Sequence, residues 1–133
     1  MTKRATSFAI DGDLIIIRVL VTGPRGTASG RFVLDTGAAL TTMTHDFTDL
    51  IGYNARDGVM RTRVHTAIGV EEGYGLRVAE LDALGFTVPR FPVNVFDLGH
   101  ENIDGLIGMN FLSDFNLEIR PAELRLLAEK IAV

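Results

Sequence analysis

Short apolar segments alternate with glycine-bearing turns along this chain. Residues 14–21 are rich in isoleucine and valine, which predicts a strand that is buried on both faces. Residues 23–26 hold two glycines and a proline, which predicts a turn, and residues 28–34 then predict a second strand. This alternation of short strands and turns is typical of all-β barrels and sandwiches.

Two short helical segments interrupt the strands. Residues 45–51 follow Thr44, whose side chain is a suitable N-cap, and precede Gly52, which is a suitable helix end. Residues 110–114 predict another short helix, after a brief apolar run and a glycine. Both segments are brief, so we expect an all-β fold with one or two short helices.

The middle of the chain predicts a hairpin. Residues 60–68 and 74–81 form its two arms, and residues 69–73, with two acidic residues and two glycines, form its tip. Residues 87–96 predict a strand pair or one bent strand, whose two prolines belong at an edge or a bulge.

Composition narrows the classes of function. The 133 residues are 47% hydrophobic, so we expect one domain, residues 1–133, with a substantial core. A net charge of −4 without a basic run argues against nucleic acid as a partner. No apolar run is long enough to span a bilayer and no signal-peptide core follows the N-terminus, so we expect a cytoplasmic protein.

The chain has few metal-binding residues. Cysteine is absent, which excludes disulfides, thiolate zinc sites and cysteine nucleophiles. The three histidines, His45, His65 and His100, lack the spacing of metal ligands. We therefore expect no metal and no cofactor.

Asp35 is the first candidate for chemistry. It ends the apolar strand and is followed by Thr36 and Gly37, which can turn the backbone and supply hydrogen bonds to its carboxylate. A carboxylate in that place is costly to bury without such donors. Taken alone, however, aspartate, threonine and glycine are ordinary turn residues, and a simple turn is the better interpretation.

The wider pattern changes that judgement. Residues 32–38 resemble the catalytic loop of the retroviral-type, or retropepsin-like, aspartic peptidases. Residues 106–112, two apolar residues and a glycine before a short helix, resemble the second signature of that family, and the hairpin lies between them, where the family has its flap. The resemblance covers about residues 8–127, and the chain looks closer to the bacterial and cellular members. It implies a single-lobe, closed acid-protease β-barrel with a flap hairpin.

The resemblance also implies roles for individual residues. The catalytic set would be Asp35, Thr36 and Gly37, with Thr36 bonding across a dimer axis. Ala38 would line the cleft, and the hairpin would close over an extended peptide. The residues expected to bind substrate are Ala38, Ile68, Gly69, Val70, Ile107 and Gly108, the last two from beneath the loop.

One departure concerns dimerisation. Viral members often carry acidic residues soon after the catalytic loop, paired with an arginine after the late glycine. Here those places hold Ala39, Leu40 and Met109, so an apolar contact would replace the ion pair. This departure puts the viral mode of dimerisation in doubt more than the chemistry.

The chain contains Asp-Thr-Gly once, whereas this chemistry needs two carboxyl groups about 3 Å apart that share a proton. The second Asp35 would come from another copy in a homodimer acting on peptides or proteins. Two alternatives stay open: a catalytically silent peptide-binding or dimerisation module, and a monomer that is inactive until assembled.

Overall fold

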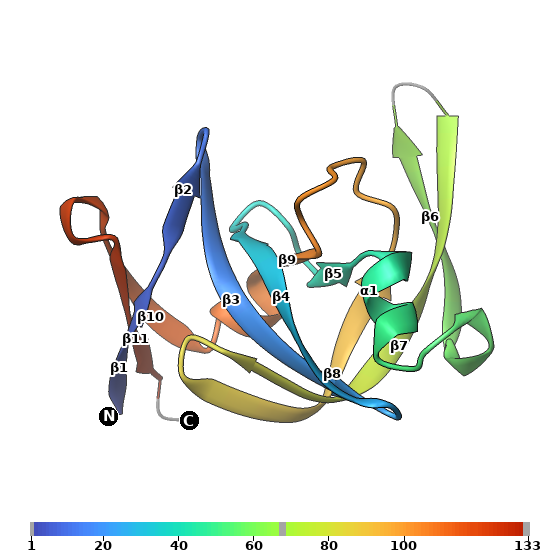
Figure 1. Cartoon of the computed structure of the whole chain (residues 1–133), viewed down its shortest axis with the longest axis horizontal. Helices are drawn as coiled ribbons and strands as arrows, with labels where there is room; N and C mark the ends of the chain where they lie inside the picture. The colour runs from blue at the N-terminus through green and yellow to red at the C-terminus, as the bar shows by residue number, and fades with distance from the viewer. Residues whose placement is uncertain (1, 67–68, 132–133) are drawn as a thin grey trace.

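The computed structural model describes residues 2–66 and 69–131. Strands dominate it, in agreement with the all-β prediction (Figure 1). The elements in chain order are β1 (Lys3–Ser7), β2 (Ala9–Asp11), β3 (Leu14–Gly23), β4 (Gly26–Leu34), β5 (Thr42–Met43), α1 (His45–Leu50), η1 (Ala55–Asp57), β6 (Met60–Thr66), β7 (Gly69–Ala83), β8 (Phe86–Val95), β9 (Gly105–Ile107), α2 (Met109–Leu112), β10 (Phe115–Arg120), η2 (Pro121–Glu123) and β11 (Arg125–Lys130).

The larger sheet closes on itself. Its strand order is β2-β3-β4-β9-β5-β8-β7-β6, and β3 also pairs with β7. That additional pairing joins Leu20, Val21 and Thr22 to Asp82, Leu81 and Glu80, so the strands from β3 to β7 form a ring. Side chains that point into the ring, including Val19, Val21, Phe32, Val78 and Leu81, are fully buried.

Strand β9 lies between β4 and β5, although it comes about 70 residues after β4 in the chain. It pairs parallel with β4, opposing Leu34 and Ile107, and antiparallel with β5, opposing Met43 and Gly105. Figure 1 shows β4, β9 and β5 beside one another, with the loop that joins β4 to β5 next to them. This insertion brings the end of β4 next to the late glycine signature.

The two ends of the chain build a second sheet. Strand β11 pairs with β1 on one side and with β10 on the other, all antiparallel. Leu126 and Ala128 on β11 are buried in the main core. The N- and C-termini lie close together at one end of the molecule (Figure 1).

The helical predictions are largely confirmed. Helix α1 begins after Thr44, whose Oγ1 accepts a hydrogen bond from the Phe47 N–H at 3.2 Å. The chain leaves the helix at Gly52, whose φ of +99° is one that glycine adopts without strain. Helix α2 begins one residue earlier than expected, at Met109, and ends at Leu112.

The hairpin differs from the prediction at its tip. Strand β6 ends at Thr66 and β7 begins at Gly69, so residues 69–73 lie within a strand and do not form the turn. Gly73 is paired with Thr62 and Glu72 with Arg63, which continues the ladder through the expected tip. The sequence signal was misleading because the two glycines suit a turn as well as a close packing contact.

The region around the two prolines forms one strand, β8, between β5 and β7. Pro89 and Pro92 oppose Glu80 and Arg77 in the ladder with β7. Arg90, between them, has a φ of +49°, and the Ala79 N–H donates instead to the Tyr53 hydroxyl at 2.9 Å. Strand β5 pairs only with Asn94 and Val95 of β8, so the two prolines lie in the part of β8 that has β7 as its one paired neighbour, which agrees with the predicted edge position.

Candidate active site

Asp35 directly continues strand β4. Its N–H donates to the Ile107 carbonyl oxygen at 3.0 Å, which extends the β4–β9 pairing by one residue. The carboxylate is half-buried, and its Oδ1 accepts a hydrogen bond from the Gly37 N–H at 2.9 Å. The chain thus presents one carboxylate at the end of a rigid strand, with a backbone donor already aimed at it.

The loop after Asp35 is tied down by main-chain bonds. The Ala38 N–H donates to the Asp35 carbonyl at 3.2 Å, which closes a tight turn. At the start of α2, the Met109 N–H donates to the Ala38 carbonyl at 2.7 Å and the Asn110 N–H to the Ala39 carbonyl at 3.0 Å. The loop and the start of α2 therefore hold each other in position.

A polar pair, the buried Thr41 and the partly buried Asn110, reinforces this contact. The Oδ1 of Asn110 accepts from both the N–H and the hydroxyl of Thr41, each at 2.8 Å, and its Nδ2 donates to the Pro92 carbonyl at 2.9 Å. Thr41 has no exposed surface, and its Oγ1 also accepts from the Gly108 N–H at 3.1 Å. Each buried polar group of Thr41 is thus satisfied, which fixes the far end of the loop.

The roles of Thr41 and Asn110 were not predicted from the sequence. A signal was available: both are polar residues within otherwise uncharged, largely apolar stretches. A buried amide or hydroxyl in such a setting requires partners, and these two residues are partners of each other.

Gly108 is needed for space and not for its backbone freedom. A Cβ atom there would lie 2.7 Å from the Leu40 carbonyl carbon and 2.8 Å from the Ala38 oxygen. Its φ of −103° is accessible to any residue. A side chain would therefore push against the backbone of the loop that carries Asp35.

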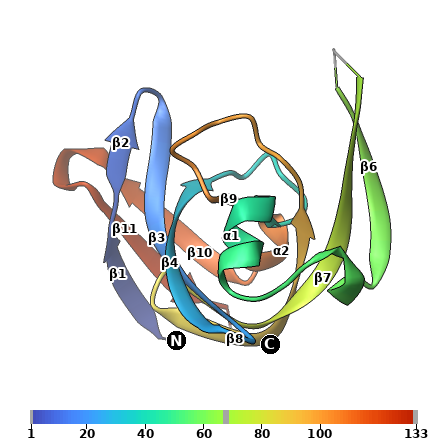
Figure 2. The same cartoon turned by 45° about the vertical axis from the view of Figure 1, so that its right-hand side comes forward.

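The structure separates the predicted site residues into two groups. Residues 35–38 are in direct contact with the β9–α2 junction, with Thr36 and Gly37 exposed and Ala38 half-buried. Gly69 and Val70 belong to the hairpin, which stands apart from that loop in both views (Figures 1 and 2). Val70 is 51% exposed, and Ile68 lies outside the described residues.

Ile107 requires a correction. Its side chain has no exposed surface and belongs to the main core, because β9 is enclosed between β4 and β5. It supports the loop from below, as expected, but it cannot contact a substrate. Gly108 is likewise in contact with the loop backbone.

A small apolar cluster, separate from the main core, lies on the face of the sheet that Asp35 shares. Val33 is two residues before Asp35 on β4, so both side chains point to the same face. Its members are the buried Ile16, Val33 and Ile103, with the partly buried Leu14, Leu98 and Leu106 packed against them. Asp35 and this apolar cluster therefore lie on the same face of the sheet.

Asp104, the other aspartate near this region, has a structural role. Its Oδ2 accepts from the Arg31 N–H at 2.9 Å, and its own N–H donates to the Arg31 carbonyl at 2.9 Å. Both bonds are made to the backbone of β4, so this carboxylate positions the strand that ends in Asp35.

Two cavities, of about 460 and 610 Å³, both have His45 in their lining, and Asp35 lines neither of them. Within residues 2–66 and 69–131, no three histidine, aspartate or glutamate side chains are grouped as metal ligands. Over the same residues, no helix combines the length and apolar character needed to cross a membrane.

Comparison with known proteins identifies a family. A sequence model of a family described as aspartyl protease matches residues 18–111, which include Asp35, Gly108 and Asn110. No curated protein matches the chain.

Solved structures share the fold at low sequence identity. A retropepsin-like aspartic protease from Rickettsia conorii superposes with a TM-score of 0.71 at 19% identity, covering 96% of this chain and 98% of that one. An EIAV protease in complex with an inhibitor has a TM-score of 0.56 at 21% identity, covering 74% and 85%. The retroviral protease-like domain of Ddi1 from Leishmania major has a TM-score of 0.58 at 15% identity, covering 90% and 94%. Together with the family match, these likenesses show that the chain belongs to the aspartyl protease family and has a retropepsin-like fold.

Proposed function

We propose that this protein is an aspartic endopeptidase whose active site is completed by a second copy of the chain. Each copy contributes one Asp35, and the two carboxyls meet on a two-fold axis. The proposal rests on the single Asp-Thr-Gly sequence of the chain. It places one half-buried carboxylate at the end of β4, where the Gly37 N–H donates to it. One such group is half of the acid–base pair that peptide hydrolysis needs.

The chemistry follows from placing two carboxyls about 3 Å apart, where both cannot ionise together. The ionised Asp35 takes a proton from a bound water, and the oxygen of that water attacks the scissile carbonyl carbon. The protonated Asp35 of the other copy donates its proton to the carbonyl oxygen. The Gly37 N–H stabilises the ionised form of its own carboxylate and holds it in register.

The apolar cluster beside Asp35 supports a preference in the substrate. Leu14, Leu98 and Leu106 are only partly buried, so they offer apolar contact next to the carboxylate. We expect peptides with an aliphatic or aromatic side chain beside the cleaved bond. Ala38 would line the cleft near the scissile bond, and Gly69 and Val70 would contact the peptide as the hairpin closes over it.

Cleavage of a diverse peptide library tests the proposal. Wild type should cleave, and Asp35→Asn should lose activity by about 10³-fold, within the range for general acid–base groups. Asp13→Asn is the matched control, because Asp13 is an exposed acid in the β2–β3 turn. Equal residual activity in wild type and Asp35→Asn would exclude Asp35 as the catalytic acid. Peptide binding without any cleavage by wild type would favour the silent binding module.

A further inference from the structure

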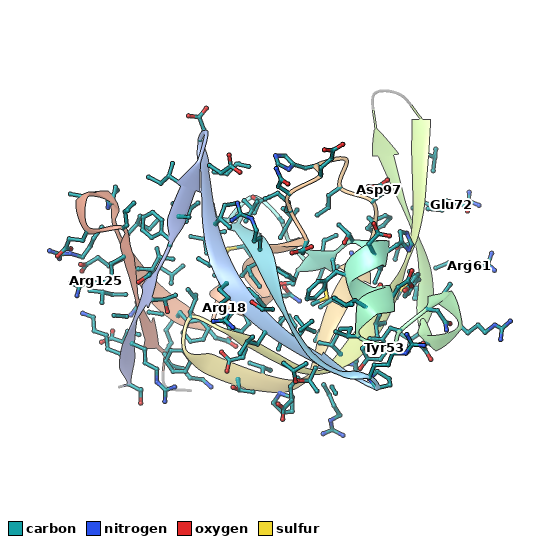
Figure 3. The ribbon with its side chains drawn as sticks, in the orientation of Figure 1. Arg18, Tyr53, Arg61, Glu72, Asp97 and Arg125 are labelled. Atoms are coloured by element: carbon teal, nitrogen blue, oxygen red, sulfur yellow. The ribbon has the colours of Figure 1, made fainter. Side chains whose placement is uncertain are left out.

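Two arginines are opposed to each other across strands β3 and β4. Arg18 and Arg31 are direct partners in the antiparallel ladder, so their side chains leave the same face of the sheet. Both residues are exposed, and Figure 3 labels Arg18 on β3. Like charges in directly opposed positions repel each other and destabilise a sheet. An anion bound between the two side chains would remove that repulsion.

A hydrogen bond at Nε holds each of these side chains. The Arg18 Nε donates to the Ser29 Oγ at 2.8 Å, and the Arg31 Nε donates to the Asn102 carbonyl oxygen at 3.1 Å. Each bond uses one of the five N–H groups of its guanidinium and restricts the rotation of the side chain. The two guanidinium groups are therefore oriented before any ligand binds, which lowers the entropy cost of binding.

Acidic side chains neutralise the arginine pair only in part. The Asp11 Oδ2 lies 3.5 Å from the Arg31 Nη2, and the two side chains are 45% and 51% exposed, so this ion pair is weak. Asp104 accepts from the backbone N–H of Arg31 and not from its guanidinium. Within residues 2–66 and 69–131, no ion pair includes Arg18. Arg18 thus keeps donors for an anionic ligand.

The two arginines line a cavity of about 310 Å³ with largely apolar walls. The other lining residues are Ala9, Ile16, Ile17, Ser29 and Gly30. This volume is at the lower end of the range of about 300–1,000 Å³ for small-molecule sites. A guanidinium group donates two parallel N–H groups to the two oxygens of a carboxylate, while the apolar walls suit a short aliphatic chain.

We propose that Arg18 and Arg31 bind a carboxylate attached to a short aliphatic chain, with that chain against Ala9 and Ile16. Two sources offer this group: a free organic acid and the glutamate side chain of a bound peptide. Arg31 precedes Asp35 by four residues, which is about 13 Å along an extended strand. The arginine site is therefore separate from the loop that carries Asp35, and binding at it does not require the proposed peptidase activity.

Isothermal titration calorimetry with hexanoate at low ionic strength tests the proposal. Hexanamide keeps the chain without the charge, and acetate keeps the charge without most of the chain, so each should bind at least about 10-fold more weakly than hexanoate. Arg18→Gln and Arg31→Gln should each weaken hexanoate binding by about 10- to 100-fold. Arg56→Gln is the matched control, because it removes the same charge from an exposed position in η1. Thermal unfolding shows whether each variant folds.

Two further variants separate a binding role from a structural one. Asp11→Asn removes the competing carboxylate and should tighten hexanoate binding by about 2- to 5-fold. Without ligand, Arg18→Gln should melt at the same temperature as wild type or higher, since it removes one of two opposed like charges. A clearly lower melting temperature for Arg18→Gln, with unchanged hexanoate binding, would assign Arg18 to stability alone and overturn the proposal.

A peptide arm identifies the source of the carboxylate. An acetylated, amidated peptide with one glutamate is compared with its glutamine counterpart. Binding of hexanoate supports a free organic acid, and binding of the glutamate peptide alone supports an acidic side chain. The proposal is overturned if neither ligand binds wild type, or if both bind Arg18→Gln and Arg31→Gln as tightly as wild type. Asp35→Asn should bind like wild type, so a failure of the peptidase proposal leaves this result intact.

Discussion

The loop that carries Asp35 and the hairpin of β6 and β7 are held by different kinds of contact. Buried and partly buried hydrogen bonds among Thr41, Gly108 and Asn110 fix the loop to the β9–α2 junction. The hairpin extends beyond the body of the molecule, and its described ion pair, Arg63 with Glu72, is 3.8 Å long with both side chains about three-quarters exposed. The loop is fixed firmly enough for a group whose chemistry requires precise placement. The hairpin has fewer restraints, as is usual for an element that moves when a ligand binds.

Asn110→Leu tests the loop side of this contrast and should have the largest effect. The change leaves the Thr41 N–H, the Thr41 hydroxyl and the Pro92 carbonyl without their partner. We expect a loss of about 2–4 kcal/mol in the free energy of unfolding, since a buried unsatisfied polar group costs about 1–3 kcal/mol. Chemical denaturation measures it, with the exposed Asn116→Leu as control. Equal stability of the two variants would contradict a fixed loop.

Gly73→Ala tests whether the base of the hairpin is as firmly packed. A Cβ at Gly73 would lie 2.1 Å from the Val95 carbonyl oxygen, so β7 and β8 must separate. We expect a loss of about 1–3 kcal/mol, the usual range for overpacking. In the same strand, Gly75→Ala meets no atom closer than 3.7 Å and should change stability little. Similar melting temperatures for the two variants would show that β7 and β8 can separate at Gly73 at little cost in stability.

Tyr74 lies at the base of the hairpin and contacts Thr48 of α1. Its contribution to the free energy of unfolding depends on pH. Burial raises the pKa of Tyr74 above its usual value near 10, and the nearby Asp49 and Asp57 raise it further against a hydrogen bond with Thr48. The neutral phenol is therefore favoured in the folded state. Its contribution is complete below about pH 10 and is lost as the pH rises through the folded-state pKa.

Tyr74→Phe removes that titration. The free energy of unfolding of wild type should fall more steeply with pH above about 10 than that of the variant, and the two should differ little near pH 7. Urea denaturation at a series of pH values measures both slopes. Parallel curves over the alkaline range would mean that the phenol is not desolvated.

Arg63→Ala should have the smallest effect. Exposed ion pairs contribute about 0–1 kcal/mol, so we expect a change within about 0.5 kcal/mol. Denaturation at low and high salt measures it. A loss above 1 kcal/mol would mean that the hairpin is fixed in place, and the contrast with the loop would weaken.

Local signals in the sequence were sufficient for much of the fold. The isoleucine- and valine-rich segment became β3, and Thr44 caps α1 as expected, because both depend on neighbouring residues. The hairpin tip was misplaced because Gly73 is required by Val95, a residue 22 positions away.

The site could be predicted in part. The contact between the loop that carries Asp35 and the late glycine was expected from two short segments of the sequence, and the structure brings these segments together; the catalytic role of the loop stays a prediction. The Thr41–Asn110 pair and the apolar cluster could not be located, since their members come from distant segments that only the folded chain brings together. Ile107 was assigned to substrate contact because sequence alone does not tell which apolar residue is enclosed by neighbouring strands.

The position of β9 between β4 and β5 has a consequence for biosynthesis. Asp35 is bonded to Ile107, and its loop to Met109 and Asn110, so these bonds form only after about 70 further residues have been synthesised. A growing chain on the ribosome therefore carries the acid long before it can hold it in place, and contacts so distant in sequence form late in folding. The bonds that position Asp35 on the side of β9 and α2 are therefore among the last that the emerging chain can make.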